Sequence, residues 1–260
     1  MNTMDVFGLL RLPLSTSSSL ALLLLVQGAV LAQSPCEHQV AAQIQLFRSN
    51  DGEAIRAAVR TLGKLGAAAV PALMETLTDQ QEDRGVRLSA AQTLGKVGSA
   101  AVPPLIAALE DPREQVRIDA AFALGQVGPV AATALTEALQ AQSVILRHFA
   151  AFAFHQNPHL AAAGSQDLFE ATKDEQPLVR ANALRALSSI RPVVPQVVSV
   201  LLKALEERDA QVRTVAVQAL GEIRLATPEI LTAVNEMLLD TDERVSQSAV
   251  RTLLTLSNLP

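Results

Sequence analysis

The sequence contains no tryptophan, no tyrosine and only one cysteine, Cys36. A lone cysteine rules out a disulfide scaffold, and without Trp and Tyr the usual stacking surfaces for sugars and bases are missing. Positive charge is also scarce, since 21 Lys and Arg stand against 26 Asp and Glu, a formal net charge of −5. Because a basic field dominates nucleic-acid affinity, we do not expect nucleic acid as a partner.

Apolar residues, in contrast, are plentiful. They make up 49% of the 260 residues, which is enough to bury a continuous core. The first concentration of them is the run from Leu20 to Ala32, which follows a Ser-rich stretch and Arg11. This pattern is typical of a secretory signal, and the run is shorter than the roughly 20 residues that cross a bilayer.

We therefore predict a cleaved signal peptide over residues 1–32 and an exported chain, periplasmic or extracellular, over residues 33–260, with no membrane span. An uncleaved leader that anchors the protein at a membrane surface is the alternative. A lipoprotein signal is disfavoured because Gln33, Ser34 and Pro35 precede Cys36 where small and aliphatic residues are needed. Cys36 is then a bystander in a loose terminus or forms an intermolecular disulfide.

The rest of the chain is a repeat with a period near 32 residues. The strings that begin at Val86-Arg87, Val116-Arg117 and Val212-Arg213 match one another and end in Leu-Gly, and weaker copies bring the total to seven. Each unit opens with an apolar helical pattern that has proline near its start, as in Val102-Pro103. A second helix follows, with Val86, Ala90, Leu94 and Val97 on one stripe, and Gly66, Gly98 and Gly128 suit a left-handed helix end.

Neither helix of a unit can bury its apolar face alone, so neighbouring units must stack. The pattern predicts an all-α protein, an α-solenoid in the form of a right-handed superhelix of about seven helix pairs. The units resemble HEAT repeats, and in particular the subgroup of phycobilisome-lyase-like HEAT repeats. That resemblance covers about residues 37–257 and rests on these matches: Val102 to Leu105, Leu109-Glu110-Asp111, Val116-Arg117, Ala120-Ala121 and Leu124-Gly125.

An arginine recurs at the same place in five successive units, and it is preceded by an acid in most of them. One hypothesis is a basic ladder for an anionic ligand. The favoured one, which the resemblance to HEAT repeats implies, is that each arginine pairs with the acid that precedes it and that these pairs brace the loops between repeats. The residues concerned are Arg87, Arg117, Arg147, Arg180, Arg213, Asp111, Asp174 and Asp209; the fourth unit has Gln142-Ser143 in place of the acid, and the seventh has Ser246 in place of the arginine.

No catalytic or metal-binding pattern emerges. His148 and His155 are seven residues apart and could share a helix face, but nearby carboxylates to complete a site are absent. The metalloenzymes built on HEAT-like repeats use His-Glu dipeptides, and none occurs here. Instead, His155 replaces the glycine of the Leu-Gly step. No activated Ser or Cys and no phosphate-binding loop is recognisable, so we expect no enzymatic activity, no metal and no cofactor.

One surface feature carries a sharper hypothesis. The residues one and five places after each repeated arginine should point away from the core stripe. In three successive units they are largely apolar, and in the last three they are largely polar. If the second helices line the concave side, as in HEAT repeats, an exposed apolar strip results; the alternative is that these side chains pack between repeats. The strip comprises Leu88, Ile118, Phe122, His148 and Phe152.

Three functions remain open at this point. The first is a non-enzymatic scaffold that binds a protein or peptide partner on its concave helix surface. The second is a phycobilin lyase or isomerase-like factor that attaches a chromophore to cytoplasmic antenna proteins, which the predicted leader disfavours. The third is an architectural spacer without a dedicated partner. The repeat itself indicates the fold and leaves the function undetermined.

Overall fold

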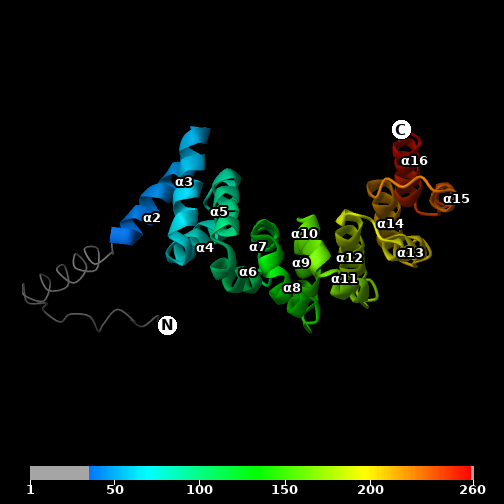
Figure 1. The fold of residues 1–260 in the computed structure, drawn as a ribbon, viewed down its shortest axis with the longest axis horizontal. Coiled ribbons are helices and arrows are strands. Elements are labelled where there is room, and N and C mark those ends of the chain that lie inside the picture. The colour runs from blue at the N-terminus through cyan, green and yellow to red at the C-terminus, as the bar shows by residue number, and fades with distance from the viewer. Residues whose placement is uncertain (1–34, 259–260) are drawn as a thin grey trace, which may run out of the picture.

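The computed structural model describes residues 35–258, and these residues form seven consecutive helix pairs along the long axis of the molecule (Figure 1). We number the pairs as repeats 1 to 7 and call the first helix of each the A helix and the second the B helix. The predicted signal peptide lies outside the described residues. The pairs are α2 (Pro35–Gln45) and α3 (Gly52–Leu65), α4 (Val70–Thr78) and α5 (Arg84–Val97), α6 (Val102–Ala108) and α7 (Glu114–Val127), α8 (Ala132–Leu139) and α9 (Val144–His155), α10 (Pro158–Ala163) with α11 (Ser165–Ala171) and α12 (Pro177–Ser189), α13 (Pro195–Ala204) and α14 (Ala210–Glu222), and α15 (Pro228–Glu236) and α16 (Glu243–Ser257).

The B helices form the continuous spine of the molecule, because each packs against the B helix of the next repeat from α3 to α16. Their apolar stripe is the predicted one. In α5, Val86, Ala90 and Leu94 are buried, and the residues of the same register are buried in α7 and α14. Val97 is half-buried at the edge of this core. The α-solenoid predicted from the repeat is the observed fold.

Glycine ends the first three B helices for a conformational reason. Gly66, Gly98 and Gly128 have φ of 60°, 81° and 76°, as the predicted helix ends require. Their ψ values, −131°, −135° and −151°, place them beyond the left-handed helical region, in backbone space that a Cβ disfavours. The chain thereby reverses into short 3-10 turns, η2 (Gly66–Ala69), η3 (Gly98–Ala101) and η4 (Gly128–Ala131), that lead into the next A helix.

The other helix ends also follow local chemistry. Prolines occupy the first turns of α4 and α6, where a missing N–H costs little. Side-chain oxygens cap several B helices: Asp209, for example, accepts hydrogen bonds from the N–H groups of Gln211 and Val212 at 2.8 and 3.2 Å. These devices fix where each helix begins, so the stripe of every repeat meets its neighbour in the same phase.

The glycine of the Leu-Gly step allows neighbouring B helices to approach closely. A Cβ on Gly95 would overlap the Cβ of Gln126 and lie 3.2 Å from its backbone carbon, and Gly125 is equally close to Gln156. Where the glycine is replaced, a polar side chain bonds to the next helix instead. His155 Nδ1 lies 3.2 Å from the Arg185 carbonyl, and Ser188 Oγ donates to Glu222 at 2.8 Å.

Repeats 4 and 5 depart from the common pattern because they carry large aromatic side chains. Phe154 is fully buried and lies against Gly164, where the A helix of repeat 5 breaks into α10 and α11. Phe149 is buried and makes an edge-to-face contact with the half-buried Phe152, with ring centroids 6.4 Å apart. The aromatic residues therefore fill space between helices in this part of the solenoid.

The close approach at Gly95 gives a test of this packing. Gly95→Ala should lower the free energy of unfolding by about 1–3 kcal/mol, because the backbone of α7 must move to admit the methyl group. Gly85→Ala is the matched control on the same helix: nothing lies within 4 Å of its Cβ position, and removing a glycine should stabilise the helix by up to about 1 kcal/mol. Urea unfolding of both variants measures the difference, and equal effects would contradict the close approach.

Candidate functional site

The predicted strip lies along one edge of three successive B helices, α5, α7 and α9. All five of its side chains, Leu88, Ile118, Phe122, His148 and Phe152, are half-buried, so none is freely exposed as expected for an open groove. Ile118, Phe122 and Phe152 pack against the core cluster. The B helices are closely spaced, so part of each strip side chain is covered while the rest of its surface stays in solvent.

Farther along the row of B helices, at α14 and α16, the equivalent positions carry polar residues, and a hollow lies beside them. A cavity of about 400 Å³ opens between α14 and α16 and is lined by Gln218 and Arg251, which hold the strip positions of repeats 6 and 7. Arg224, Ser248 and Thr252 complete much of its wall. The face therefore changes from apolar at α5–α9 to polar and hollow at α14–α16, as the sequence predicted for its residue types.

The repeated arginines each anchor their own A–B loop through one nitrogen. Nη1 of Arg117 donates to the carbonyls of Asp111 and Pro112 at 2.7 and 3.0 Å. Nη1 of Arg147, Arg180 and Arg213 donates to the equivalent pair of carbonyls five and six residues earlier, and Nη1 of Arg87 donates to the Glu82 carbonyl. The arginine thus closes the loop through backbone groups.

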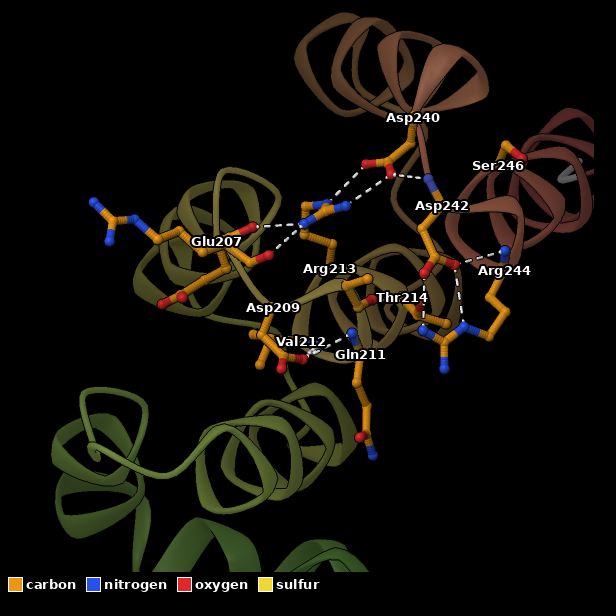
Figure 2. Close-up of polar contacts among 12 residues, drawn as sticks. Glu207, Asp209, Gln211, Val212, Arg213, Thr214, Asp240, Asp242, Arg244 and Ser246 are labelled. Atoms are coloured by element: carbon orange, nitrogen blue, oxygen red, sulfur yellow. Dashed lines mark hydrogen bonds and ion pairs between the residues drawn. The ribbon is translucent and has the colours of Figure 1, made fainter.

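The carboxylate partner comes from the following repeat. Arg147 holds Asp174 through Nε and Nη2 at 2.7 and 3.2 Å, and Arg213 holds Asp240 at 2.7 and 2.8 Å (Figure 2). Arg180 binds Glu207 through Nη2 alone, at 3.1 Å. In all three pairs the acid lies 27 residues after the arginine. Each guanidinium therefore ties one loop to the next.

This arrangement corrects the pairing expected within a unit. The carboxylate of Asp209 caps α14 instead of binding Arg213, and that of Asp111 binds Arg113 at 2.7 Å. Asp174 does bind an arginine, but it is Arg147 of the preceding repeat; Arg180 takes only its carbonyl. The physical reason is direction: Nη1 faces the loop of its own repeat, so the Nε–Nη2 edge faces the next one.

Three acids of this network, Asp119, Glu207 and Asp240, were not identified from the sequence. The constant spacing of 27 residues in the 33-residue units was a signal that would have identified Glu207 and Asp240. Asp119 has no such signal, because it reaches Arg87 from within helix α7, at 3.2 Å. It is buried and also accepts a hydrogen bond from Gln115 at 2.8 Å.

The charges of these pairs stabilise one another. The hydrogen bonds that Arg213 donates to Asp240 hold the pKa of Asp240 below its ordinary value and raise the pKa of Arg213. In the last loop, Arg244 lowers the pKa of Asp242 to about 2. The side chains of Arg213 and Asp240 are only 14% and 8% exposed, so their attraction is screened less than that of a surface pair.

His148 is held neutral within the strip. Burial lowers its pKa below the ordinary value of 6.5; the charges of Arg117 and Arg185 lower it further, while the Leu178 backbone and Glu114 oppose the shift. Asn182 Nδ2 lies 3.1 Å from His148 Nδ1 and donates to the His148 carbonyl at 3.3 Å. Within residues 35–258, no cluster of three or more His, Cys, Asp or Glu side chains suits a metal ion.

One helical stretch in the described part of the chain, Glu114–Leu139, is long and apolar enough to cross a membrane by composition. Half of its apolar window is buried inside the solenoid, and Gly128 divides it into α7 and α8. It is therefore part of the helical core. The half-buried Cys36 packs against the core in α2 and carries no disulfide among the described residues.

The fold and this face define an α-solenoid of stacked helix pairs. The family model of HEAT repeats matches residues 40–125, 81–154, 132–221 and 198–258, so the chain belongs to the HEAT-repeat family. Such a fold is typically a non-enzymatic scaffold for protein binding. The narrower resemblance to phycobilisome-lyase-like repeats is not confirmed and stays a prediction.

Solved structures share the fold at low sequence identity. The X-ray structure of YibA from Escherichia coli is 24% identical, with 79% of this chain and 75% of that chain covered and a TM-score of 0.51. A mutant of Kap121p is 13% identical, with 84% and 29% covered and a TM-score of 0.57. A designed armadillo repeat protein in complex with the peptide (KR)4 is 18% identical, with 83% and 98% covered and a TM-score of 0.45. No curated protein matches the sequence.

A double-mutant cycle tests which acid each arginine uses. Asp240→Asn combined with Arg213→Gln should reveal a coupling energy of about 1–2 kcal/mol. Either single change already breaks the partly buried ionic pair, so the second change costs less than it does alone. Asp209→Asn with the same arginine variant should couple by less than about 0.5 kcal/mol, since asparagine still caps α14. Urea unfolding gives both coupling energies. A larger coupling of Arg213 with Asp209 than with Asp240 would show instead that the arginine pairs within its own unit.

The neutral state of His148 predicts a pH dependence of stability. Because the pKa is lowered in the folded state, the unfolded chain takes up the proton first as the pH falls. The contribution of His148 to the free energy of unfolding should therefore be fully present above pH 6.5 and should be lost as the pH drops from 6.5 toward the lowered pKa. His148→Gln should flatten this slope in urea unfolding between about pH 5 and 7.5, whereas His159→Gln, at an exposed position, should keep it.

Proposed function

We propose that the protein is an exported, non-enzymatic scaffold that binds a protein or peptide partner along the concave row of its B helices. The observation that carries the proposal is the change of character along one register of that row. Half-buried apolar side chains of α5, α7 and α9 give way to a hollow of about 400 Å³ between α14 and α16, whose lining residues are of polar types. An extended partner with an apolar and a polar end fits such a face in one direction only.

The strip supplies the apolar part of this binding face. Leu88, Ile118, Phe122, His148 and Phe152 keep part of their surface in solvent although they lie beside a well-packed core. Ile118, Phe122 and Phe152 pack against that core, which fixes their positions before a partner arrives and so reduces the entropy lost on binding. Rigid aromatic anchors of this kind commonly contribute most of the binding energy at protein interfaces.

Photo-crosslinking from the two faces tests the proposal. A photoreactive amino acid at Gln92 or Gln218, both exposed at strip positions, should capture the same partner in the native host, and one at Thr133 on an A helix should not. Leu88→Ser with Phe122→Ser should lower the capture at least about tenfold, since two apolar anchors are removed. Capture from Thr133 alone would place the partner on the other side.

The folding of Phe122→Asp separates the strip from the packing alternative. If the strip serves a partner, the variant should keep its helical circular dichroism and a melting temperature within several degrees of the parent while losing the crosslink. If the side chain serves only the packing between repeats, the variant should unfold, because an unpaired carboxylate is then forced against the core. Val130→Asp, at an exposed position on η4, is the control for the added charge.

The compartment is tested by the intact mass and N-terminal sequence of the protein from its native host. We expect a chain that begins at Gln33 in the exported fraction, as predicted for cleavage after Ala32. A full-length chain in the soluble cytoplasmic fraction would contradict export. A chromophore-transfer assay would then be the next experiment, because the lyase alternative acts in that compartment.

A further inference from the structure

The arginine network has one break, and it lies beside the strip. In repeats 5 to 7, an acid lies six residues before the position of the repeated arginine, and it binds the arginine of the preceding repeat. These acids are Asp174, Glu207 and Asp240. In repeat 4 this position is Ala141. Its carbonyl still accepts a hydrogen bond from Arg147 at 3.0 Å, as the Asp174 carbonyl does from Arg180, so the loop keeps its conformation and lacks only the carboxylate.

A second source of carboxylate is also missing for Arg117. Arg87 takes its acid from helix α7, where Asp119 lies two residues after the next column arginine. The residue in that register of α9 is Phe149, and the Cζ atom of Arg117 lies 5.0 Å from the centre of its ring. The two positions that supply an acid to the other arginines are thus occupied by Ala141 and Phe149 in the repeat that follows Arg117, and neither is acidic.

The guanidinium of Arg117 is held in place, and it has no carboxylate partner among residues 35–258. Its Nη1 is fixed by two carbonyls, and the ring of Phe149 supports it through a cation–π contact. Its Nε is buried without a hydrogen-bond partner. Nη2 has none either and is not among the buried atoms, and no carboxylate oxygen of residues 35–258 lies within 4.0 Å of the group. Arg147 and Arg213 bind a carboxylate through both Nε and Nη2. Arg180, whose Nε is likewise buried without a partner, binds Glu207 through Nη2 alone. Nη2 is therefore the atom that Arg117 offers to a ligand.

The position of this group connects it with the binding face. Ile118 of the strip follows Arg117 directly in α7, and the charge of Arg117 acts on His148, the strip residue of α9. An acidic residue of a partner on the strip would therefore meet a guanidinium that is already oriented and partly desolvated. Charge-assisted pairs of this geometry are among the stronger polar contacts in proteins.

We propose that the Arg117–Phe149 pair is a carboxylate-binding subsite that takes an Asp or Glu side chain of the partner in place of the acid that Ala141 lacks. This inference rests on the proposed function, since the carboxylate belongs to the bound partner. In effect, the partner completes the arginine network between repeats 3 and 4. The subsite also adds specificity for charge to a strip that is otherwise apolar.

Two labelled peptides and three variants test the subsite. The probes are fluorescein-labelled peptides of four Leu-Glu or four Leu-Gln dipeptides, with affinity measured by fluorescence anisotropy at low salt. The parent protein should bind the Glu peptide at least about tenfold more tightly, the value of one good ionic contact. Arg117→Gln should abolish this preference. Ala141→Asp should abolish it as well, because it supplies the acid from within the chain.

Ala141→Asp has a readout that needs no peptide. The new carboxylate should bind Arg117 and raise the melting temperature by about 2–4 °C. In the preceding repeat Arg113 takes the carboxylate of Asp111, but the residue at the equivalent place here is Ser143, which does not compete for the acid. Thr133→Asp, which adds the same charge at an exposed position on α8, should change neither the melting temperature nor the peptide preference by a comparable amount.

The outcomes separate the subsite from the scaffold function. Equal binding of both peptides to the parent protein, or a Glu preference that survives in Arg117→Gln, would overturn the subsite and leave peptide binding intact. Absence of binding by either peptide at about 1 mM, a range in which weak contacts are still detected, would also overturn it. In that case crosslinking from Gln92 and Gln218 decides the scaffold function independently.

Discussion

The structure depends on the close approach of each B helix to the next. No single helix pair can bury its apolar faces, so the stability of every repeat is shared with its neighbours. Small residues make the approach possible: Ala90 and Ala120 lie fully buried on the stripe, and Gly95 and Gly125 have no room for a Cβ. The spacing that results also decides how far an arginine can reach and how much of a strip side chain stays in solvent.

The arginine network adds polar links between successive repeats to this packing. Each guanidinium binds backbone carbonyls of one loop and, at Arg147, Arg180 and Arg213, a carboxylate of the next loop. Each such pair links two successive loops, and the hydration that its partly buried ions lose offsets part of their attraction. The break at Arg117 thus leaves one inter-repeat joint without such a link, in the middle of the molecule and beside the aromatic repeat 4.

The functional face combines features that fit a binding scaffold better than a catalyst. His148, the one titratable side chain of the strip, is kept neutral by burial and engaged by Asn182, which suits a fixed contact and not proton transfer. The apolar strip lies on α5, α7 and α9, and the guanidinium of Arg117, which lacks a carboxylate partner, lies beside it on α7. The hollow at Gln218 and Arg251 lies farther along the same helix row. Together they would give an extended partner both a direction and a register.

The sequence by itself determined the period, the number of units, the buried stripe and the helix ends. These features depend on local chemistry, since proline and capping side chains act within one turn and a glycine with positive φ ends each of the first three B helices. The tertiary structure decided which acid each arginine binds and how deeply the strip is buried. Asp209 and Arg213 are neighbours in sequence and do not pair, because the guanidinium edge faces the following repeat, a direction that only the stacking of the helices sets.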